Sequence, residues 1–356
     1  MGVYRTLLLA AVLEFLLIIL QLLWLGGRLV LAAAEDREHR RFAEACGPTF
    51  LAAVDGPAQR ALWLLNVARW RPETAATYIH TYLRRTEGAY HDAVASLYRD
   101  AGLHLHDLRM LRSWRWPRRA LALRRLSEVA LPGDDIHVTV EARDPYPVRI
   151  STLVLLAKVG GADDMLDALS TLRVPRRLME QPLHAALVTL PPEMLSDVME
   201  AWEGLPDPIV RRVLLLAAAE RAPVTCLRWM EVAASDPDAE IRVGACMAAG
   251  RLGTPEAFRL LLGLLGDADW VVRARAASAL GAHGEPSGVD ALGFALGDPV
   301  PWVRQNAATS LRLLGDEGLG RLRSVAAASQ DPLARRTAEA EIRNHEVLVE
   351  AQGGKP

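Results

Sequence analysis

Arginines at a fixed spacing are the residues of this sequence with the clearest capacity for chemistry. Arg211, Arg242, Arg273, Arg304 and Arg335 are each separated by 31 residues. A guanidinium group presents five N–H donors in a planar fork that fits carboxylates and phosphates. Two interpretations follow. The row is structural and recurs once in each unit of an array, or it is a row of ligand-binding side chains.

A second group of arginines is interleaved with tryptophans. Trp114 and Trp116 lie within it, and Asp107 is the nearest preceding acid. Such a patch could bind anionic lipid headgroups, at about 1 kcal/mol per basic residue near a membrane surface, or RNA or an acidic partner. The alternative is a solvated helix face whose arginine stems cover apolar groups. The arginines of this patch are Arg109, Arg112, Arg115, Arg118, Arg119, Arg124 and Arg125.

One carboxylate interrupts a long apolar run near the N-terminus. Residues 7–25 read LLLAAVLEFLLIILQLLWL, in which Glu14 and Gln21 are the two polar positions, and Arg28 follows. The three are spaced by seven residues, which is nearly two helical turns, so they share one helix face. A polar face on a lone membrane helix favours docking against another membrane helix. The alternative is a protonated Glu14 tolerated in lipid.

The apolar run predicts one transmembrane helix. Its length suits a bilayer span, and Tyr4 and Trp24 stand about 30 Å apart along a helix, where they would anchor the two interfaces. Basic residues are more numerous after the run than before it, so we expect the N-terminus outside and the rest cytoplasmic. A cleaved signal peptide is the alternative, because Ala32-Ala33-Ala34 resembles a cleavage site. The sequence leaves open whether residues 1–34 are retained.

No catalytic or cofactor motif stands out. We find no phosphate-binding glycine loop, nucleophile elbow or zinc-binding His/Glu pair. Cys46, Cys226 and Cys246 have neither metal nor disulfide spacing, which favours a reducing compartment. The formal net charge of −2 gives no global attraction to nucleic acid. We therefore predict no catalytic residue, metal or cofactor. Nucleic acid is the less favoured partner, with the patch of arginines and tryptophans as its one candidate site.

Units of 31 residues must position the regularly spaced arginines. Each unit has an Asp-led entry, an Ala/Leu-rich run, a glycine break and a second apolar run, as in DADWVVRARAASALGAHGEPSGVDALGFALG from Asp267. Asp267 and Asp298 suit helix caps, Pro299 a first helical turn, and Gly281 and Gly284 a helix end. Each unit is thus predicted to be a helix pair, and stacking of the pairs supplies the core.

This pattern resembles HEAT-like repeats, in the short form named after the phycobilisome lyases. The match rests on Asp-x-x-x-x-Val-Arg-x-x-Ala-x-x-x-Leu-Gly at residues 267–281 and is strong over residues 207–342. The resemblance implies a ladder of hydrogen-bonded Asp and Arg side chains between adjacent units. A fainter register continues back to Arg149 and Arg118, whereas Glu180 stands where arginine is expected. Eight units are predicted from about Arg118, two of them degenerate.

We therefore predict an all-α fold: a right-handed α-solenoid of stacked helix pairs preceded by one transmembrane helix. The expected domains are an anchor (1–34), a helical linker and N-terminal cap (35–116), the solenoid (117–346) and a disordered tail (347–356). Within the linker, helix breaks are expected at Gly47-Pro48, Gly56-Pro57 and Arg71-Pro72. Residues 135–143 alternate like a strand, but the repeat register favours a short helix there.

Two functions of different classes fit this architecture. The first is a membrane-anchored scaffold whose solenoid binds a protein partner, with Trp270 and Trp302 as candidate partner-surface residues unless they serve packing. Only two of the 41 basic residues are lysine, which suggests a bacterial genome, so the inner membrane is the expected location. An accessory subunit of a membrane enzyme, such as a glycosyltransferase, is a narrower form of this hypothesis. The second function is a bilin-attaching lyase or lyase subunit, which rests on the resemblance alone.

Overall fold

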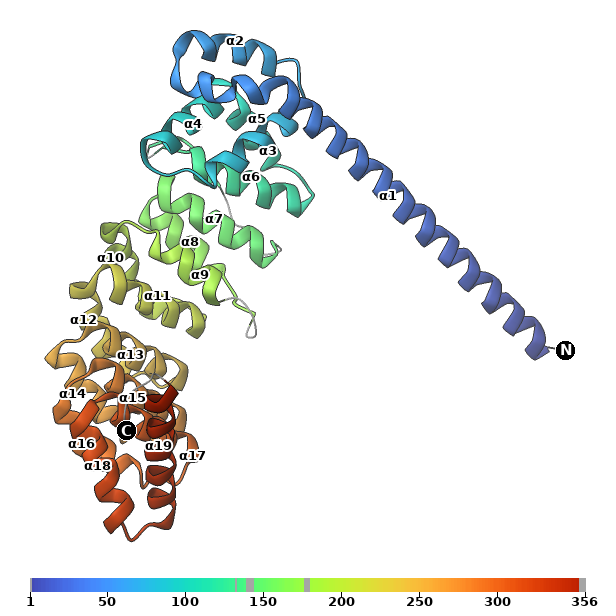
Figure 1. Cartoon of the computed structure of the whole chain (residues 1–356). Helices are drawn as coiled ribbons and strands as arrows, with labels where there is room; N and C mark the ends of the chain where they lie inside the picture. Colours follow the sequence, from blue (N-terminus) through green and yellow to red (C-terminus); the bar gives the residue numbers. More distant parts are fainter. Residues whose placement is uncertain (1, 132, 139–143, 176–179, 352–356) are drawn as a thin grey trace. The chain divides into compact units, whose positions relative to one another are not determined.

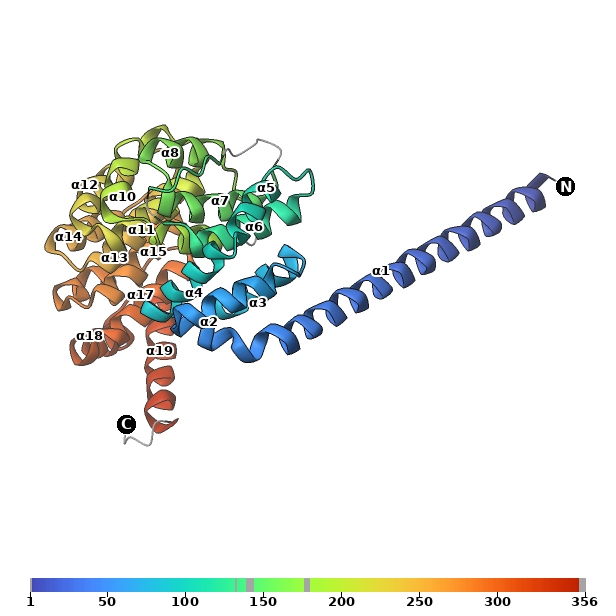
Figure 2. The same cartoon turned by 90° about the horizontal axis from the view of Figure 1, so that it is seen from above.

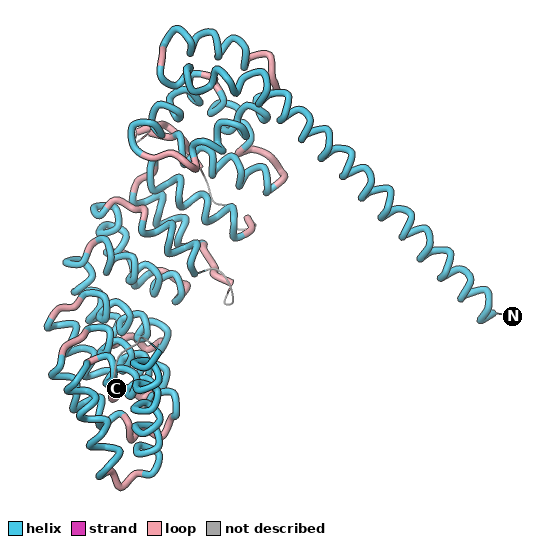
Figure 3. The backbone as a smooth tube through the Cα atoms, in the orientation of Figure 1, coloured by secondary structure: helices cyan, strands magenta, loops and turns pink. Residues whose placement is uncertain are grey.

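The computed structural model of the protein is built from helices. It describes residues 2–131, 133–138, 144–175 and 180–351, with side chains from residue 14 onward. Within these ranges every regular element is helical and no strand occurs (Figure 3). The prediction of an all-α fold is confirmed.

The chain divides into two compact units between Val129 and Ala130. Each unit has its own hydrophobic core, formed by residues 42–129 in the first and 153–338 in the second. The helix that contains Arg118, which the sequence assigns to the solenoid, lies in the first unit.

The first unit contains six helices, of which α1 is by far the longest (Figure 1). Proline begins α2 and α3, where its missing N–H costs no helical hydrogen bond. The helix breaks expected at Gly56-Pro57 and Arg71-Pro72 are therefore confirmed. The helices are α1 (Gly2–Asp55), α2 (Pro57–Val67), α3 (Pro72–Leu83), α4 (Gly88–Asp100), α5 (Leu103–Met110) and α6 (Trp116–Val129).

The break expected at Gly47-Pro48 is wrong, because Pro48 lies inside α1. A proline within a helix removes one N–H and disturbs the preceding turn. Side chains of α2 compensate in that turn: Trp63 Nε1 donates to the carbonyl of Cys46 over 2.9 Å, and Asn66 Nδ2 donates to that of Ala45 over 3.4 Å. α1 therefore continues without interruption from its apolar segment into the core of the first unit.

The second unit is a stack of helix pairs. Six pairs and a final single helix are described, and they follow the 31-residue frame that the sequence predicts from Arg149 onward. The bounds are α7 (Tyr146–Val159), α8 (Ala162–Thr171), α9 (Glu180–Val188), α10 (Pro192–Glu200), α11 (Pro208–Arg221), α12 (Pro223–Ala234), α13 (Ala239–Leu252), α14 (Pro255–Leu264), α15 (Trp270–His283), α16 (Val289–Ala295), α17 (Pro301–Leu313), α18 (Gly315–Ala328) and α19 (Pro332–Ala351).

The helix pairs form two layers. The first helices of the pairs, α7 to α17 in odd numbers, lie side by side in one layer, and the second helices, α8 to α18 in even numbers, lie in the other (Figure 1 and Figure 2). Buried alanines such as Ala245, Ala276 and Ala307 recur at one position of the odd-numbered layer. Their small side chains allow neighbouring helices to approach closely. The predicted solenoid of stacked helix pairs is confirmed.

The helix caps lie two residues later than the sequence suggests. Asp269, not Asp267, caps α15: its carboxylate accepts the N–H of Val271 over 2.8 Å. Asp207 and Asp238 cap α11 and α13 in the same way, one period apart. α17 has Val300 at the capping position, and the first helical proline is Pro301 rather than Pro299.

Glycines have two different roles in α15. Gly284 ends the helix with φ of 78°, in the left-handed region that favours glycine, as predicted. Gly281 lies inside the helix, so the prediction that it ends α15 is wrong. A Cβ at Gly281 would lie 2.6 Å from Cβ of Ser310 on α17, so this glycine permits the close approach of two helices.

The short helix expected over residues 135–143 is not formed in the part that the structure describes, since residues 135–138 are irregular. Residues 139–143 of that prediction lie outside the described residues. The tail expected to be disordered from 347 is helical as far as Ala351, and residues 352–356 again lie outside the description.

Candidate functional site

The regularly spaced arginines bind aspartates of the following repeat. Arg242 donates from Nε and Nη2 to both carboxylate oxygens of Asp267, over 2.8 and 2.9 Å. Arg273 binds Asp298 in the same two-point manner, over 2.7 and 3.1 Å. Arg211 makes one such bond to Asp236 over 2.9 Å. We call these three pairs the ladder.

Arg242 and Arg273 of the ladder, and Arg304 beyond it, also bind the loop of their own repeat. Nη1 of Arg273 donates to the carbonyls of Asp267 and Ala268, and Arg242 and Arg304 bond to the two equivalent carbonyls of their own loops. In Arg242 and Arg273 the donors that could meet a ligand are therefore occupied by protein groups. This geometry supports the structural interpretation of the row over the ligand-binding one.

Electrostatics of the ladder follow from the same contacts. Burial alone would raise the pKa of Asp267 and Asp298, but hydrogen bonds from Arg242 and Arg273 and from backbone N–H groups outweigh it and hold both pKa values below the ordinary one. Hydrogen bonding to the carboxylates raises the pKa of Arg242 and Arg273. All four groups are charged at neutral pH.

The ladder ends beyond Arg273. Ser329 stands where the aspartate partner of Arg304 is expected. Arg304 is buried, and its Nη1 donates to the carbonyls of Asp298 and Pro299 in its own loop. Arg335, the fifth member of the row, is exposed. At the other end of the row, Arg149, two repeat lengths before Arg211, donates hydrogen bonds to the loop carbonyls of Asp144 and Thr171.

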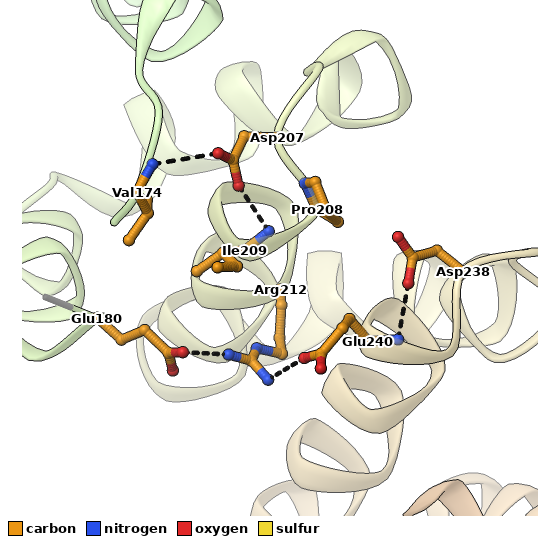
Figure 4. Close-up of a pocket in the computed structure, with 8 residues that line it drawn as sticks. All are labelled: Val174, Glu180, Asp207, Pro208, Ile209, Arg212, Asp238 and Glu240. Carbon is orange, nitrogen blue, oxygen red and sulfur yellow. Dashed lines mark hydrogen bonds and ion pairs between the residues drawn. The ribbon is translucent and has the colours of Figure 1, made fainter. Parts of the chain in front are cut away.

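Glu180, which replaces the expected arginine, takes part in a different network. Its carboxylate accepts from Nη2 of Arg212 over 2.5 Å, and Nη1 of Arg212 donates to Glu240 over 2.6 Å (Figure 4). One guanidinium on α11 therefore joins α9 to α13. In this repeat the acidic Glu180 stands at the position of the ladder arginine, and the arginine that it contacts lies in the next repeat.

These residues line a cavity of about 430 Å³ together with Val174, Pro208, Ile209 and Asp238 (Figure 4). The aspartates in it are already engaged: Asp207 accepts from Val174 N and Ile209 N, and Asp238 accepts from Glu240 N. The cavity is thus a junction of structural contacts rather than a set of free catalytic carboxylates.

Metal and thiol chemistry find no support in the described part of the chain. No group of three or more His, Cys, Asp or Glu side chains there could hold a metal ion. All three cysteines are buried and unpaired, and burial raises the pKa of Cys226 and Cys246 to about 12. Such thiols remain protonated and behave as small apolar side chains.

Trp270 and Trp302 are exposed and lie on neighbouring helices of one layer. Trp270 is the first residue of α15, with 43% of its surface exposed, and Trp302 is the second residue of α17, with 65% exposed. The second residues of α15 and α19, Val271 (38%) and Leu333 (47%), continue the same position at 31-residue intervals. We call these four residues the apolar row. Sequence reasoning missed Val271 and Leu333, although the period that found the arginines also connects them to Trp302.

The predicted basic patch spans the turn between α5 and α6. Arg112, Arg115 and Arg118 are exposed there, and Trp114 is 83% exposed with the Arg115 guanidinium 5.1 Å from its ring centre. We call residues 109–119 the basic hairpin. Arg119 is partly buried, with Nη1 donating to the carbonyl of Ser113. Arg109 and Arg124 are exposed members of the patch.

Arg125 does not lie with the other arginines of the patch. Its side chain is buried inside the first unit, where it contacts Asp107 over 3.4 Å and Thr77 Oγ1 over 2.6 Å. Tyr98 donates to the other oxygen of Asp107. Burial raises the pKa of Asp107 to about 6, against the lowering effect of Tyr98 and Arg125. Nothing in the spacing of the arginines distinguishes this buried member from its neighbours.

The apolar part of α1 is exposed from Phe15 to Leu31, within the residues whose side chains the structure describes. Of the described residues, the part of α1 from Glu14 to Asp55 is the one stretch long and apolar enough to cross a membrane, judged by length and composition. Its most apolar window has a mean hydropathy of 2.1, and none of it is buried by the rest of the chain. Glu14, Gln21 and Arg28 are all exposed, and Arg28 stacks over Trp24 at 5.0 Å.

Comparisons with known proteins agree with the repeat architecture. Residues 196–280 and 259–343 match the family model for HEAT repeats. A search of curated proteins finds no match.

Solved structures that are similar to this chain include proteins of different kinds. A chain of Kap121p, solved bound to Nup53p, covers 82% of this chain at 15% identity and a TM-score of 0.40, and this chain spans 40% of its length. An engineered protein covers 81% of this chain, and 84% of its own, at 16% identity and a TM-score of 0.31. Human deoxyhypusine hydroxylase, solved with glycerol, covers 67% of this chain, and 99% of its own, at 16% identity and a TM-score of 0.26.

Proposed function

Because this chain is a HEAT-repeat protein over residues 196–343, we propose that it is a membrane-anchored scaffold that binds a protein partner at the cytoplasmic face of a bacterial inner membrane. HEAT repeats make a surface suited to protein–protein interaction, since each unit adds side chains at a regular interval. The single observation that carries the proposal is the apolar row, where three exposed apolar side chains follow the repeat register and Trp270 stands next to the first of them.

The apolar row has the properties of a docking surface for protein. Exposed tryptophans are rare on surfaces that remain in water and are enriched at the centres of interfaces. Neighbouring helices of a layer stand roughly 10 Å apart, so the second residues of α15, α17 and α19 form a continuous strip rather than scattered side chains. A partner with an apolar segment, such as one face of a helix, fits this strip.

The anchor part of the proposal rests on α1. An exposed helix as apolar as this one is costly in water but stable in a bilayer. Glu14, Gln21 and Arg28 give it one polar face, which we propose docks against another membrane helix. The basic hairpin belongs to the same unit, and its arginines would meet anionic headgroups near the membrane surface.

An accessory subunit of a membrane-embedded enzyme, such as a glycosyltransferase, is the narrower form of this proposal. It is favoured by the polar face of α1, because an accessory chain needs a second contact inside the bilayer. A bilin-attaching lyase is the alternative function. This alternative would be supported if co-expression with bilin-making enzymes left a chromophore covalently bound to an acceptor protein.

The test is capture of a partner from membranes by the full chain, compared with two variants. Trp270→Ser with Trp302→Ser should remove the partner identified with the parent chain. Val224→Ser is the matched control, because Val224 is 83% exposed on α12, in the other layer, and this change should leave the partner bound. Equal capture by the parent and the double variant would rule out the apolar row as the docking surface.

The docking role of α1 has its own test. Glu14→Leu removes the polar group near the middle of the apolar segment and should dissociate the membrane complex on a native gel in mild detergent. Glu14→Gln should retain much of it, because an amide still forms hydrogen bonds. A complex that is unchanged by Glu14→Leu would contradict docking through this face.

A further inference from the structure

A second basic site, separate from the basic hairpin, lies where α1 enters the folded part of the first unit. Arg37 and Arg41 on α1 and Arg69 and Arg71 in the turn between α2 and α3 line a groove of about 600 Å³. Trp70 stands between the last two arginines. Ala34 and Glu38 of α1 complete the lining. We call this the arginine groove.

Charge in the groove is strongly unbalanced. Four guanidinium groups face one carboxylate, and that carboxylate is already engaged: Glu38 accepts from Thr74 Oγ1 over 2.9 Å and lies 3.4 Å from Nη1 of Arg71. Among the described residues no carboxylate lies within ion-pair distance of Arg37, Arg41 or Arg69. Gathering like charges in one groove is unfavourable unless an anion neutralises them.

The walls of the groove are fixed by the core of the unit. The ring of Trp70 packs edge-on against the buried ring of Phe42, with 5.4 Å between centres. The turn that carries Arg69 and Arg71 is closed by hydrogen bonds from Arg69 N to Asn66 O and from Trp70 N to Val67 O. The backbone that carries Arg69 and Arg71 is held in this way, and a guanidinium group is suited to bind phosphate at two points.

The position of the groove along α1 points to the source of the phosphate. Leu29, Val30 and Leu31 are all exposed, and with Ala32 to Ala34 they extend the apolar surface of α1 to the edge of the groove. Arg37 lies six residues beyond Leu31, about 9 Å along the helix axis. The apolar surface of α1 thus continues past Trp24, and an apolar stretch longer than the hydrocarbon core crosses a bilayer at a tilt. A lipid whose acyl chains lie against Leu29 to Leu31 then has its phosphate beside the arginines of the groove.

We propose that the arginine groove binds the phosphate headgroup of an anionic membrane phospholipid, whose acyl chains lie along the apolar surface of α1. This rests on the proposed anchoring of α1 in a membrane. The bound lipid fixes the depth at which the folded unit sits above the bilayer, because it joins α1 and the α2–α3 turn to one headgroup.

The experiment titrates the full chain, purified in an uncharged detergent, with single lipids and counts bound lipids by native mass spectrometry. Phosphatidylglycerol should be retained at least tenfold more tightly than phosphatidylcholine. Arg69→Gln with Arg71→Gln should weaken its binding by about tenfold. Arg84→Gln with Arg85→Gln is the matched control, since it removes the same charge from an exposed site at the end of α3, and it should leave binding unchanged.

Three results would overturn the proposal. They are equal retention of both lipids, equal weakening by the two double variants, or inorganic phosphate that binds as tightly as the lipid and competes with it. Circular dichroism of each variant verifies the fold. Extraction of native membranes with alkaline carbonate tests the anchor separately. A chain released by carbonate that still retains phosphatidylglycerol through Arg69 and Arg71 would contradict the anchor and leave the groove intact.

Discussion

At the scale of single residues, one guanidinium group holds two adjacent repeats together in the middle of the second unit. Arg273 holds the loop that precedes its own helix and the aspartate that precedes the next helix, with five donors in a fixed geometry. The aspartate in turn accepts a backbone N–H of that loop, as Asp298 does from Val300. The arginine, the aspartate and the loop backbone therefore each depend on the other two for their hydrogen bonds.

Arg273→Met should lower the free energy of unfolding of the second unit by about 2 kcal/mol, because it leaves a largely buried Asp298 without its partner. Arg335→Met, at the exposed end of the same row, should change it by less than about 0.5 kcal/mol. Urea denaturation of the two variants measures the difference. Equal effects would mean that the ladder contributes nothing beyond helix propensity.

His80 and Asp107 should have opposite effects on how the stability of the first unit depends on pH. Burial lowers the pKa of His80 to about 4, so its stabilising contribution is complete above its ordinary pKa of 6.5 and is lost as pH falls through 4. Burial raises the pKa of Asp107 to about 6, so its contribution is complete below its ordinary pKa of 3.8 and is lost as pH rises through 6. Between pH 6.5 and 4 the two changes oppose each other.

His80→Gln removes one side of this balance. The first unit of the variant should gain stability, relative to its own value at pH 7, as pH falls to about 4.5, whereas the parent changes less. Hydrogen exchange of peptides from α3 to α6, corrected for intrinsic rates, measures this. His137→Gln, at an exposed histidine in the second unit, serves as control. Parallel pH curves for the parent and His80→Gln would contradict the assignment.

At the scale of elements, close helix contacts in the odd-numbered layer depend on single missing side chains. Gly281→Ala should destabilise the second unit by about 1–3 kcal/mol, since its Cβ would meet the backbone of Ser310 and push α15 from α17. Gly263→Ala is the counterpart in α14, where a Cβ meets nothing within 4 Å, so it should stabilise by up to about 1 kcal/mol. Thermal unfolding of both variants distinguishes the signs, and two changes of the same sign would refute the packing role.

Much of the second unit was predictable because its determinants are local and recur. A 31-residue period places the ladder, the capping aspartates and the core alanines together, so the same pattern can be recognised in several successive repeats. The caps were misplaced by two residues because Asp267 and Asp269 are both aspartates in the same loop, and only the geometry shows which of them meets the helix N–H groups.

The first unit was less predictable for a physical reason. Its contacts join segments without any period: the arginine groove combines α1 with a turn about 30 residues later. α1 passes through Pro48 because Trp63 and Asn66 donate to carbonyls nearby, which no local rule anticipates. Arg125 is buried for the same kind of reason, through partners on α3 and α5.

At the scale of the whole molecule, the orientation of the chain across the membrane is the property to test. We predict that the N-terminus lies outside and both compact units lie in the cytoplasm. A Cys in place of Gly2 should react with a membrane-impermeant maleimide on intact cells, and a Cys in place of Arg84 only after lysis. The native cysteines give little background because all three are buried. The reverse labelling pattern would contradict the proposed topology.

The unbroken course of α1 through Pro48 has a mechanical consequence. The helix rotates by 100° for each residue, and Phe42, Cys46 and Phe50 occupy its core-facing side in the first unit. A partner that binds the Glu14 face inside the bilayer therefore also sets the direction in which the first unit faces around the axis of α1. A rotation of the membrane-embedded end of α1 would be passed to the first unit, because the helix continues unbroken between them.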